Sequence, residues 1–444
     1  MKIQRSASVN PALPNVQVNS GFKKQRLVLC IAAVLAFNMW FFVDHMWAPP
    51  VDIHFSDLYP RWYGSRELLL HGRDPYGSGV TQDIQIWNYG RVLKPGEARD
   101  ECRFNYPLYI VFLFAPTIGL SFAKVVALFR WILPALACIT VLFWVLMLRW
   151  RCSKPILGAL VLLSFGSFPV LESIYLQQPV LVASFLLAGA GATLTAGRLP
   201  LAGLLLACST IKPQLSALVL PWLLLWAVSD WRSRKVFAGT FAVTIAVLLG
   251  GAQILRPGWL GEFLTDIAVY RRFIGHISLL NVLLGPQLGD FAAAALILAL
   301  ALVTWRWRRQ PAGSRQFNLA VCMILVATVL IMPTLFPTSQ MLLQPAVFFV
   351  LMNSRRLWTN GKFSRLVYVA TLGLLAWPLL ASTVMALASL AAPLSSIRRF
   401  WIVPLSTVPL TPLALAAILT LLVPEGKRVA ARNATAGVGD ASVL

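Results

Sequence analysis

The first apolar stretch of the chain, residues 27–47, reads LVLCIAAVLAFNMWFFVDHMW and directly follows Lys23, Lys24 and Arg26. About 20 apolar residues are enough to cross the hydrocarbon core of a bilayer, and the stretch is longer than the core of a signal peptide. No small-residue cleavage site follows it. The stretch therefore predicts an uncleaved first transmembrane helix that leaves its basic flank in the cytoplasm.

The rest of the chain has the composition of a membrane protein. Of its 444 residues, 58% are hydrophobic and only 12% are charged, and the mean hydropathy is +0.73. Polar side chains are too few to cover a soluble globule of this size. The formal net charge of +22 comes from Lys and Arg in short clusters between apolar stretches, a pattern that fits membrane topology better than nucleic-acid binding.

Further apolar stretches follow, each bounded by charged residues or by Pro and Gly. They lie near 125–148, 156–173, 179–196, 199–211, 214–229, 236–254, 289–305, 317–336, 340–353, 366–388 and 402–423. With the first helix they predict an all-α polytopic membrane protein of about 12 transmembrane helices. The apolar residues 106–120 are too few to cross and contain Pro107 and Pro116, so we expect a re-entrant or interfacial helix there.

The basic clusters predict the orientation of the chain. They fall on alternate loops, on the side of Lys23 and Lys24, and consist of Arg149/Arg151/Lys154, Arg198, Arg232/Arg234/Lys235, Arg306/Arg308/Arg309/Arg315, Arg355/Arg356/Lys362/Arg365 and Lys427/Arg428/Arg432. The positive-inside rule then places both termini in the cytoplasm of a multi-pass plasma-membrane protein.

Three parts follow from this topology. Residues 1–26 are expected to be a disordered cytoplasmic tail, residues 27–423 a single integral-membrane domain, and residues 424–444 a second cytoplasmic tail. Residues 48–124 are then a first extracytoplasmic loop with interfacial or re-entrant helices. Loops of that length usually have a function, so we expect one here.

Asp57 in this loop is our candidate general base. The apolar spacing from Tyr63 to Leu70 predicts a short amphipathic helix in the membrane interface, ended by Gly72. A carboxylate between that helix and the first span would be partly desolvated, which tunes its pKa toward proton transfer. The alternative is that Asp57 only caps the helix or faces water.

Lys212 is the second candidate. It stands beside Pro213 at the outer turn between two apolar stretches. A lysine in such a place is costly unless it faces a partner or a polar cavity, and it would suit an anion such as a lipid phosphate. The alternative is that the side chain extends to the headgroup region.

The outer segment 270–281 is a further candidate phosphate-binding face, because it joins Arg271 to His276 and Asn281. The alternative is an ordinary loop held by headgroup contacts. The six cysteines are scattered, and only Cys102 falls in a predicted outer loop. With His54, His71 and His276 far apart as well, the sequence predicts no disulfide, no metal site and no cofactor.

Several short motifs, in this order, resemble glycosyltransferase family 87. They are Ser56-Asp57-Leu58-Tyr59, Gly72-Arg73-Asp74-Pro75-Tyr76, Asn105-Tyr106-Pro107-Leu108, Leu176-Gln177-Gln178-Pro179 and Ile211-Lys212-Pro213. Family 87 enzymes depend on polyprenyl-phosphate sugars and belong to the GT-C superfamily, which includes mycobacterial phosphatidylinositol-mannoside mannosyltransferases. The resemblance implies a GT-C-like fold with a catalytic cavity open to the extracytoplasmic face. It also implies an inverting transfer of mannose or a similar sugar to a lipid or glycan acceptor.

Carried over to this chain, the resemblance makes Asp57 the base and Lys212 the phosphate-side cation. Our remaining substrate-binding candidates are Arg61, Tyr63, Asp74, Tyr76, Gln178, Arg271, His276, Asn281 and Gln340. Trp62, Tyr63 and Tyr76 could stack on sugar faces or anchor the chain in the interface. Two features depart from the family pattern: Gln177 stands where a glycine is usual, and the late outer turn 337–340 lacks the histidine that we expect.

A lipid or sugar transporter or flippase is the main alternative. It predicts broken helices and ionisable groups near the midplane in both halves. Here such groups cluster at the outer ends of helices, with Glu172 as the main exception. A polysaccharide polymerase or ligase would carry its large outer loop late, and a structural protein would not need the polar residues 57–76. We expect an enzyme whose partners are a polyprenyl-phosphate-linked sugar, a lipid or glycan acceptor and membrane lipids, with no nucleic acid.

Overall fold

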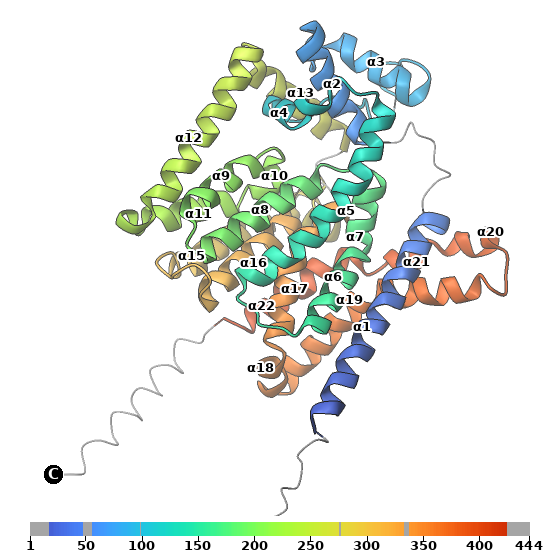
Figure 1. Cartoon of the computed structure of the whole chain (residues 1–444), viewed down its shortest axis with the longest axis vertical. Helices are drawn as coiled ribbons and strands as arrows, with labels where there is room; N and C mark the ends of the chain where they lie inside the picture. Colours follow the sequence, from blue (N-terminus) through green and yellow to red (C-terminus); the bar gives the residue numbers. More distant parts are fainter. Residues whose placement is uncertain (1–16, 48–55, 98, 275–276, 333–336, 424–444) are drawn as a thin grey trace, which may run out of the picture.

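The computed structural model describes residues 17–47, 56–97, 99–274, 277–332 and 337–423 (Figure 1). Within these ranges every regular element is a helix. The first half contains α1 (Gln17–Phe42), the π-helix η1 (Val43–Trp47), α2 (Leu58–His71), α3 (Ser78–Tyr89), η2 (Leu108–Ile110), α4 (Val111–Phe114), η3 (Ala115–Thr117), α5 (Phe122–Met147), α6 (Lys154–Phe165), α7 (Phe168–Tyr175), α8 (Val180–Thr195), α9 (Leu199–Ser209), α10 (Pro213–Ser216) and α11 (Val219–Val228).

The second half continues the helical pattern. It contains α12 (Trp231–Leu255), α13 (Trp259–Ile274), α14 (Leu279–Leu284), α15 (Pro286–Trp305), α16 (Arg315–Ile331), η4 (Pro337–Leu343), α17 (Gln344–Met352), α18 (Ser354–Thr359), α19 (Lys362–Ala388), α20 (Leu394–Ile397), η5 (Arg398–Phe400), α21 (Ile402–Leu405), η6 (Val408–Leu410) and α22 (Thr411–Thr420). The all-α prediction is confirmed for the described part of the chain.

Six helical stretches of the described residues are long and apolar enough to cross a membrane. They are Lys24–Trp47, Phe122–Met147, Trp231–Leu255, Pro286–Trp305, Lys362–Ala388 and Leu394–Thr420. Helices α6 and α7 make a seventh if they form one span, bent by 56° where they meet. These helices fit a multi-pass membrane protein.

The predicted number of about twelve spans stays a prediction. Most of the other predicted spans, such as those of α8, α9 and α16, correspond to apolar helices of 10–17 residues. At roughly 1.5 Å per residue, such helices are shorter than a hydrocarbon core of about 30 Å. The predicted re-entrant segment 106–120 forms one of these short apolar helices, Leu108–Thr117, and its place relative to a membrane remains a prediction.

Two local predictions differ from the structure. Helix α1 begins at Gln17, inside the segment 1–26 that we predicted as a disordered tail. Helix α2 begins five residues before the predicted helix 63–70 and ends before Gly72, whose left-handed φ of +66° suits glycine. It is not a simple amphipathic interface helix, because the polar side chains of Ser65 and Glu67 are also buried.

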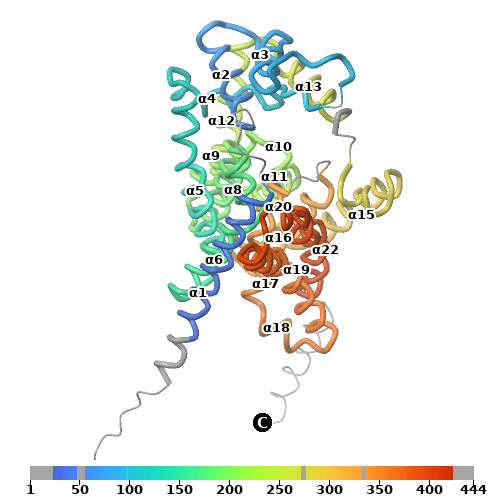
Figure 2. Tube along the Cα trace, turned by 90° about the vertical axis from the view of Figure 1, so that its right-hand side faces the viewer, coloured from blue at the N-terminus to red at the C-terminus, as the bar shows by residue number. Residues whose placement is uncertain are grey.

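Helices α2, α3, α4 and α13 gather at one end of the molecule and form what we call the cap (Figures 1 and 2). Ion pairs join its parts across long sequence distances. Arg256 after α12 contacts Asp74 after α2, with 2.9 Å from Nη2 to Oδ2. Arg103 contacts Asp266 of α13, with 2.7 Å from Nη1 to Oδ1. The cap is therefore a packed unit rather than a set of separate loops.

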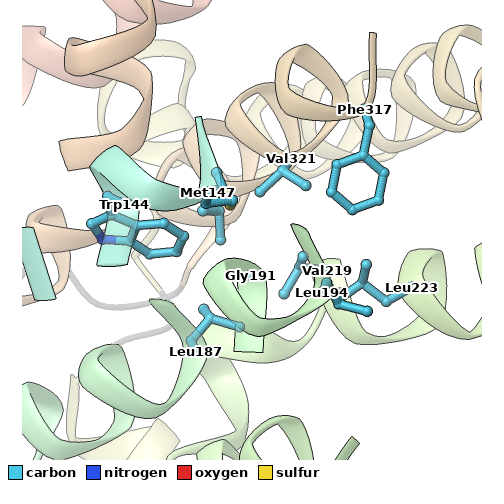
Figure 3. A pocket seen from close by; sticks show the side chains of 10 residues that line it. Trp144, Met147, Leu187, Gly191, Leu194, Val219, Leu223, Phe317 and Val321 are labelled. Carbon is cyan, nitrogen blue, oxygen red and sulfur yellow. The ribbon is translucent and has the colours of Figure 1, made fainter. Parts of the chain in front are cut away.

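The core of the helical bundle lies below the cap, where α5, α8, α11 and α16 meet (Figure 3). It contains a void of only about 10 Å³, lined by apolar side chains that include Trp144, Leu187, Leu194, Phe317 and Val321. A void of that size holds one water molecule at most. Trp144 is the lining residue with a side-chain nitrogen, and its Nε1 has no hydrogen-bond partner among the described residues. It is a packing void, so a substrate site must lie elsewhere.

Replacing Arg103 with methionine is expected to destabilise the protein by about 3 kcal/mol, because the Asp266 carboxylate would lose its partner inside the cap. Asp266 is only 2% exposed, and burial already raises its pKa. The melting temperature in detergent should fall clearly below that of the unchanged protein. The double variant Arg103→Met/Asp266→Leu should recover most of the loss. Equal melting temperatures for the unchanged protein and Arg103→Met would contradict the expected role.

Candidate active site

The turn that ends α7 meets the start of α2 beneath the cap. The backbone N–H of Asp57 donates to the carbonyl of Leu176 at 3.0 Å, and the Ser56 hydroxyl donates to Oε1 of Gln177 at 2.8 Å. Segments about 120 positions apart in the sequence are thereby joined. Asp57 is fixed by this turn rather than by its own loop alone.

Gln177 has an unusual backbone in this turn. Its φ is +54°, in the left-handed region that glycine adopts readily and most other residues avoid. Besides accepting from Ser56, its side chain donates to the carbonyl of Val126 at 3.4 Å. The two hydrogen bonds help to offset the backbone strain and hold the next residue, Gln178, in place.

The side-chain amide of Gln178 contacts both principal candidates. Its Nε2 donates to Oδ2 of Asp57, and its Oε1 accepts from Nζ of Lys212 at 3.5 Å. Lys212 immediately precedes Pro213, the first residue of α10. Asp57, Arg61, Gln178 and Lys212, which we call the Asp57 cluster, are each half-buried and so keep a solvent-accessible part.

Asp57 does not act as a helix cap. It occupies the N-cap position of α2, but its side chain makes no capping hydrogen bond and turns to Gln178 instead. One turn later, Nη1 of Arg61 donates to the Asp57 carbonyl at 3.0 Å, and its guanidinium lies 4.8 Å from the centre of the Tyr106 ring. The cluster thus places a carboxylate beside two cations.

Burial and the neighbouring charges raise the pKa of Asp57 and lower that of Lys212. Burial raises the pKa of Asp57, Arg61 lowers it, Asp100 raises it and Lys212 lowers it, with a net rise. Burial lowers the pKa of Lys212 to about 8, an effect that Arg61 strengthens and Asp57 opposes. A carboxylate with a raised pKa is a better general base than one in water.

Glu172 is a functional candidate that we did not assign from the sequence. It lies on α7, is 7% exposed, and interacts electrostatically with Asp57. The backbone N–H of Thr338 in η4 donates to its carboxylate, while Oε2 has no hydrogen-bond partner among the described residues. An acidic residue inside an apolar helix was the sequence signal that could have identified it.

Three predicted substrate-binding residues of the cap have partners within the cap. The Tyr63 hydroxyl donates to Oδ2 of Asp83 at 3.1 Å. Asp74 accepts from Arg256, and the Tyr76 hydroxyl donates to the carbonyl of Tyr106 at 2.6 Å. These contacts hold the three side chains within the cap, and their role in substrate binding stays a prediction.

The predicted substrate-binding residues of the second half of the chain have described contacts outside the Asp57 cluster. Asn281 forms a capping box with Ser278 and donates to Oδ1 of Asp290 at 2.8 Å. Nε2 of Gln340 donates to the carbonyl of Val408 at 2.9 Å, which joins η4 to η6. Arg271 is exposed on α13, and His276 lies outside the described residues. Tyr270, which precedes Arg271 on α13 and which we had not assigned, interacts electrostatically with Asp57 and Arg61.

The comparison with protein families decides the identity of the chain. The model of glycosyltransferase family 87 matches residues 104–333, just over half of the sequence. The chain belongs to glycosyltransferase family 87. The match includes Glu172, Gln178 and Lys212, whereas Asp57 precedes it. No curated protein and no solved structure matches the chain.

Membership of family 87 makes this chain a membrane glycosyltransferase, which implies a sugar donor, an acceptor and membrane lipids as partners. The structure also explains one departure from the family pattern. The left-handed φ at residue 177 is the conformation for which glycine is the usual residue. The second departure is the turn 337–340, which lacks the expected histidine. Its Gln340 side chain donates to the Val408 carbonyl of η6.

Proposed function

We propose that this family 87 protein transfers a mannose-like sugar from a polyprenyl-phosphate donor to a lipid or glycan acceptor on the extracytoplasmic face of the plasma membrane, with both termini in the cytoplasm. The observation that supports the proposal most is the Gln178 amide, which contacts the Asp57 carboxylate on one side and the Lys212 ammonium on the other. One side chain thus links a base and a cation that the chemistry would need together.

In the proposed reaction, the oxygen of an acceptor hydroxyl attacks the anomeric carbon while the bond from that carbon to the phosphate oxygen breaks. Asp57 takes the hydroxyl proton, and the leaving polyprenyl phosphate keeps the electron pair, so its charge becomes more negative by one. Attack opposite the leaving phosphate inverts the anomeric configuration. Gln178 occupies Oδ2 of Asp57, which leaves Oδ1 to receive the proton.

The cations of the cluster have a matching role. Lys212 would stabilise the charge that develops on the phosphate, and its half-buried position strengthens that interaction relative to bulk water. Arg61 would hold the Asp57 backbone, through the 3.0 Å hydrogen bond, and add positive charge beside the carboxylate. Neither of the two cavities described here, the core void and a hollow beside η1, is lined by Asp57 or Lys212. A substrate cavity at the cluster is part of the proposal.

A donor panel tests the proposal. Membranes are prepared from a host that produces the full-length chain, and synthesis of lipid-linked donors in them is blocked. They then receive one of three radiolabelled donors: a polyprenyl-phosphate sugar, a polyprenyl-diphosphate sugar or a nucleotide sugar. We expect labelled product from the polyprenyl monophosphate donor alone. Label transferred directly from the nucleotide sugar, or equally well by membranes without the protein, would overturn the donor assignment.

A further inference from the structure

Glu172 carries a buried carboxyl oxygen that has no partner in the described part of the chain. The side chain lies on α7 and is 7% exposed. The backbone N–H of Thr338 in η4 donates to the carboxyl group, but Oε2 is buried and makes no hydrogen bond to any described residue. Most buried polar atoms in native proteins are paired, because an unpaired one costs stability. Oε2 of Glu172 is therefore a candidate atom for binding a ligand.

The backbone places Glu172 next to the Asp57 cluster. Its carbonyl accepts from the N–H of Leu176 at 2.9 Å, and the carbonyl of Leu176 accepts from the N–H of Asp57 at 3.0 Å. One turn of α7 thus connects the unpaired carboxyl group with the residue that holds Asp57. The N–H of Gln178 also donates to this helix, to the carbonyl of Ser173 at 2.8 Å. Glu172 therefore lies in the wall of the cluster, which agrees with its electrostatic interaction with Asp57.

A purely structural role would explain only one of the two carboxyl oxygens. The contact with Thr338, which is 3% exposed, joins α7 to η4 and fixes the position of the side chain. A glutamine could make the same contact through its amide oxygen without the cost of burying an ionisable group. Glu172 is held at one oxygen and unpaired at the other, which is the arrangement of a preorganised binding group.

The chemistry of the unpaired oxygen favours a hydroxyl as its ligand. A hydroxyl both donates and accepts, so it can pair with a carboxyl oxygen whether that group is protonated or ionised. A phosphate would repel an ionised carboxyl group, whereas Lys212 offers the phosphate a cation. In the proposed reaction, the anomeric carbon of the sugar lies between the acceptor oxygen at Asp57 and the phosphate at Lys212. The hydroxyls of that sugar are then the ligand groups that the reaction brings to this wall.

We propose that Oε2 of Glu172 forms a hydrogen bond with one hydroxyl of the transferred sugar, which makes Glu172 a residue that determines donor specificity. The inference rests on the proposed function and adds to it a contact that selects the sugar. An open path from the Asp57 cluster to Oε2 is part of the proposal. A donor that lacks this hydroxyl would leave Oε2 unpaired in the complex, and sites built to pair a hydroxyl discriminate strongly against such analogues.

Donor analogues that each lack one hydroxyl test the contact. The substrates are polyprenyl-phosphate mannose and its monodeoxy analogues, and the measurement is kcat/KM with the full-length chain in membranes. For the unchanged protein, we expect one analogue to be transferred about 100-fold less well than the parent donor, because Oε2 stays unpaired in its complex. In Glu172→Met, transfer of the parent donor should fall about 100-fold, and this analogue should be transferred within about twofold of the parent, since the contact is already absent.

Two further variants separate a lost contact from a general loss of structure. Gln344→Met removes another buried side-chain oxygen that lacks a partner among the described residues, and the analogue should keep its deficit of about 100-fold in this variant. Glu172→Gln keeps a polar side chain of the same shape, so it should fold like the unchanged protein and retain a deficit of about tenfold, because a neutral hydrogen bond is weaker than a charged one. If Glu172→Met does not fold, the smaller deficit in Glu172→Gln decides the test.

The inference would be overturned if no analogue showed a deficit that depends on the residue at position 172, or if Glu172→Met and Gln344→Met retained the same deficit. In both cases, transfer of the parent donor by the unchanged protein would still support the proposed reaction. Absence of that transfer would overturn the proposed reaction together with this inference.

Discussion

Replacement of Asp57 with asparagine is expected to lower glycosyl transfer about 1,000-fold. General base catalysis contributes on the order of 10² to 10⁴ in rate, and an amide cannot accept the hydroxyl proton at neutral pH. Asparagine keeps the shape of the side chain and an oxygen that can accept from Gln178, so the fold should be preserved. The measurement is the initial rate of transfer from the polyprenyl-phosphate donor in membranes, at matched protein abundance.

Asp83→Asn is the matched control for Asp57. Asp83 is also an aspartate of the cap, but it pairs with Arg73 and Tyr63 outside the Asp57 cluster. Its replacement should leave transfer within about twofold of the unchanged protein. If Asp57→Asn retained full activity at a normal melting temperature, Asp57 would have no part in the chemistry, whatever the result with the control.

Replacement of Lys212 with methionine is expected to lower kcat/KM about 100-fold. Loss of one preorganised donor to a developing negative charge typically costs 10² to 10³ in rate. Methionine retains most of the apolar stem and removes only the ammonium. Lys124→Met is the control, because Lys124 is an exposed lysine at the start of α5. Equal activity of Lys212→Met and Lys124→Met would exclude the proposed role of the ammonium.

The same lysine gives a pH test in the unchanged protein. Burial lowers the pKa of Lys212 to about 8, so the fraction of protein with a charged Lys212 falls as the pH rises through that value. At the acid side, the raised pKa of Asp57 shifts the loss of activity above the pH at which an exposed aspartate would titrate. The profile of kcat/KM should therefore fall at both ends. Lys212→Arg should keep part of the activity and lose the decline above pH 8, because arginine stays charged.

The cluster could be predicted from the sequence because its members carry local signals. Asp57 lies ten positions after the first apolar stretch, 27–47, and Lys212 interrupts another apolar region beside a proline. Both patterns are costly in a membrane protein and therefore stand out. That the two meet on Gln178 could not be predicted from those signals, since the contact joins residues that are far apart in the chain.

Some predicted substrate-binding residues have partners that the sequence does not reveal, and their role in binding stays a prediction. Asp74 accepts a hydrogen bond from Arg256, which is 182 positions away. Gln340 likewise donates to the carbonyl of Val408, 68 positions away. Asn281 differs, because its partners Pro286 and Asp290 are only 5 and 9 positions further along the chain. The apolar stretches also hide breaks within helices, such as the 56° bend between α6 and α7 inside the predicted span 156–173.

The left-handed turn at Gln177 has a consequence for the evolution of this protein. A glycine at position 177 would relax the backbone but would leave the Ser56 hydroxyl without its acceptor. The two positions should therefore diverge as a pair: lineages that carry glutamine at the turn are expected to retain a hydroxyl before the aspartate, whereas in those that carry glycine that hydroxyl keeps only its role as acceptor from the backbone N–H of residue 58.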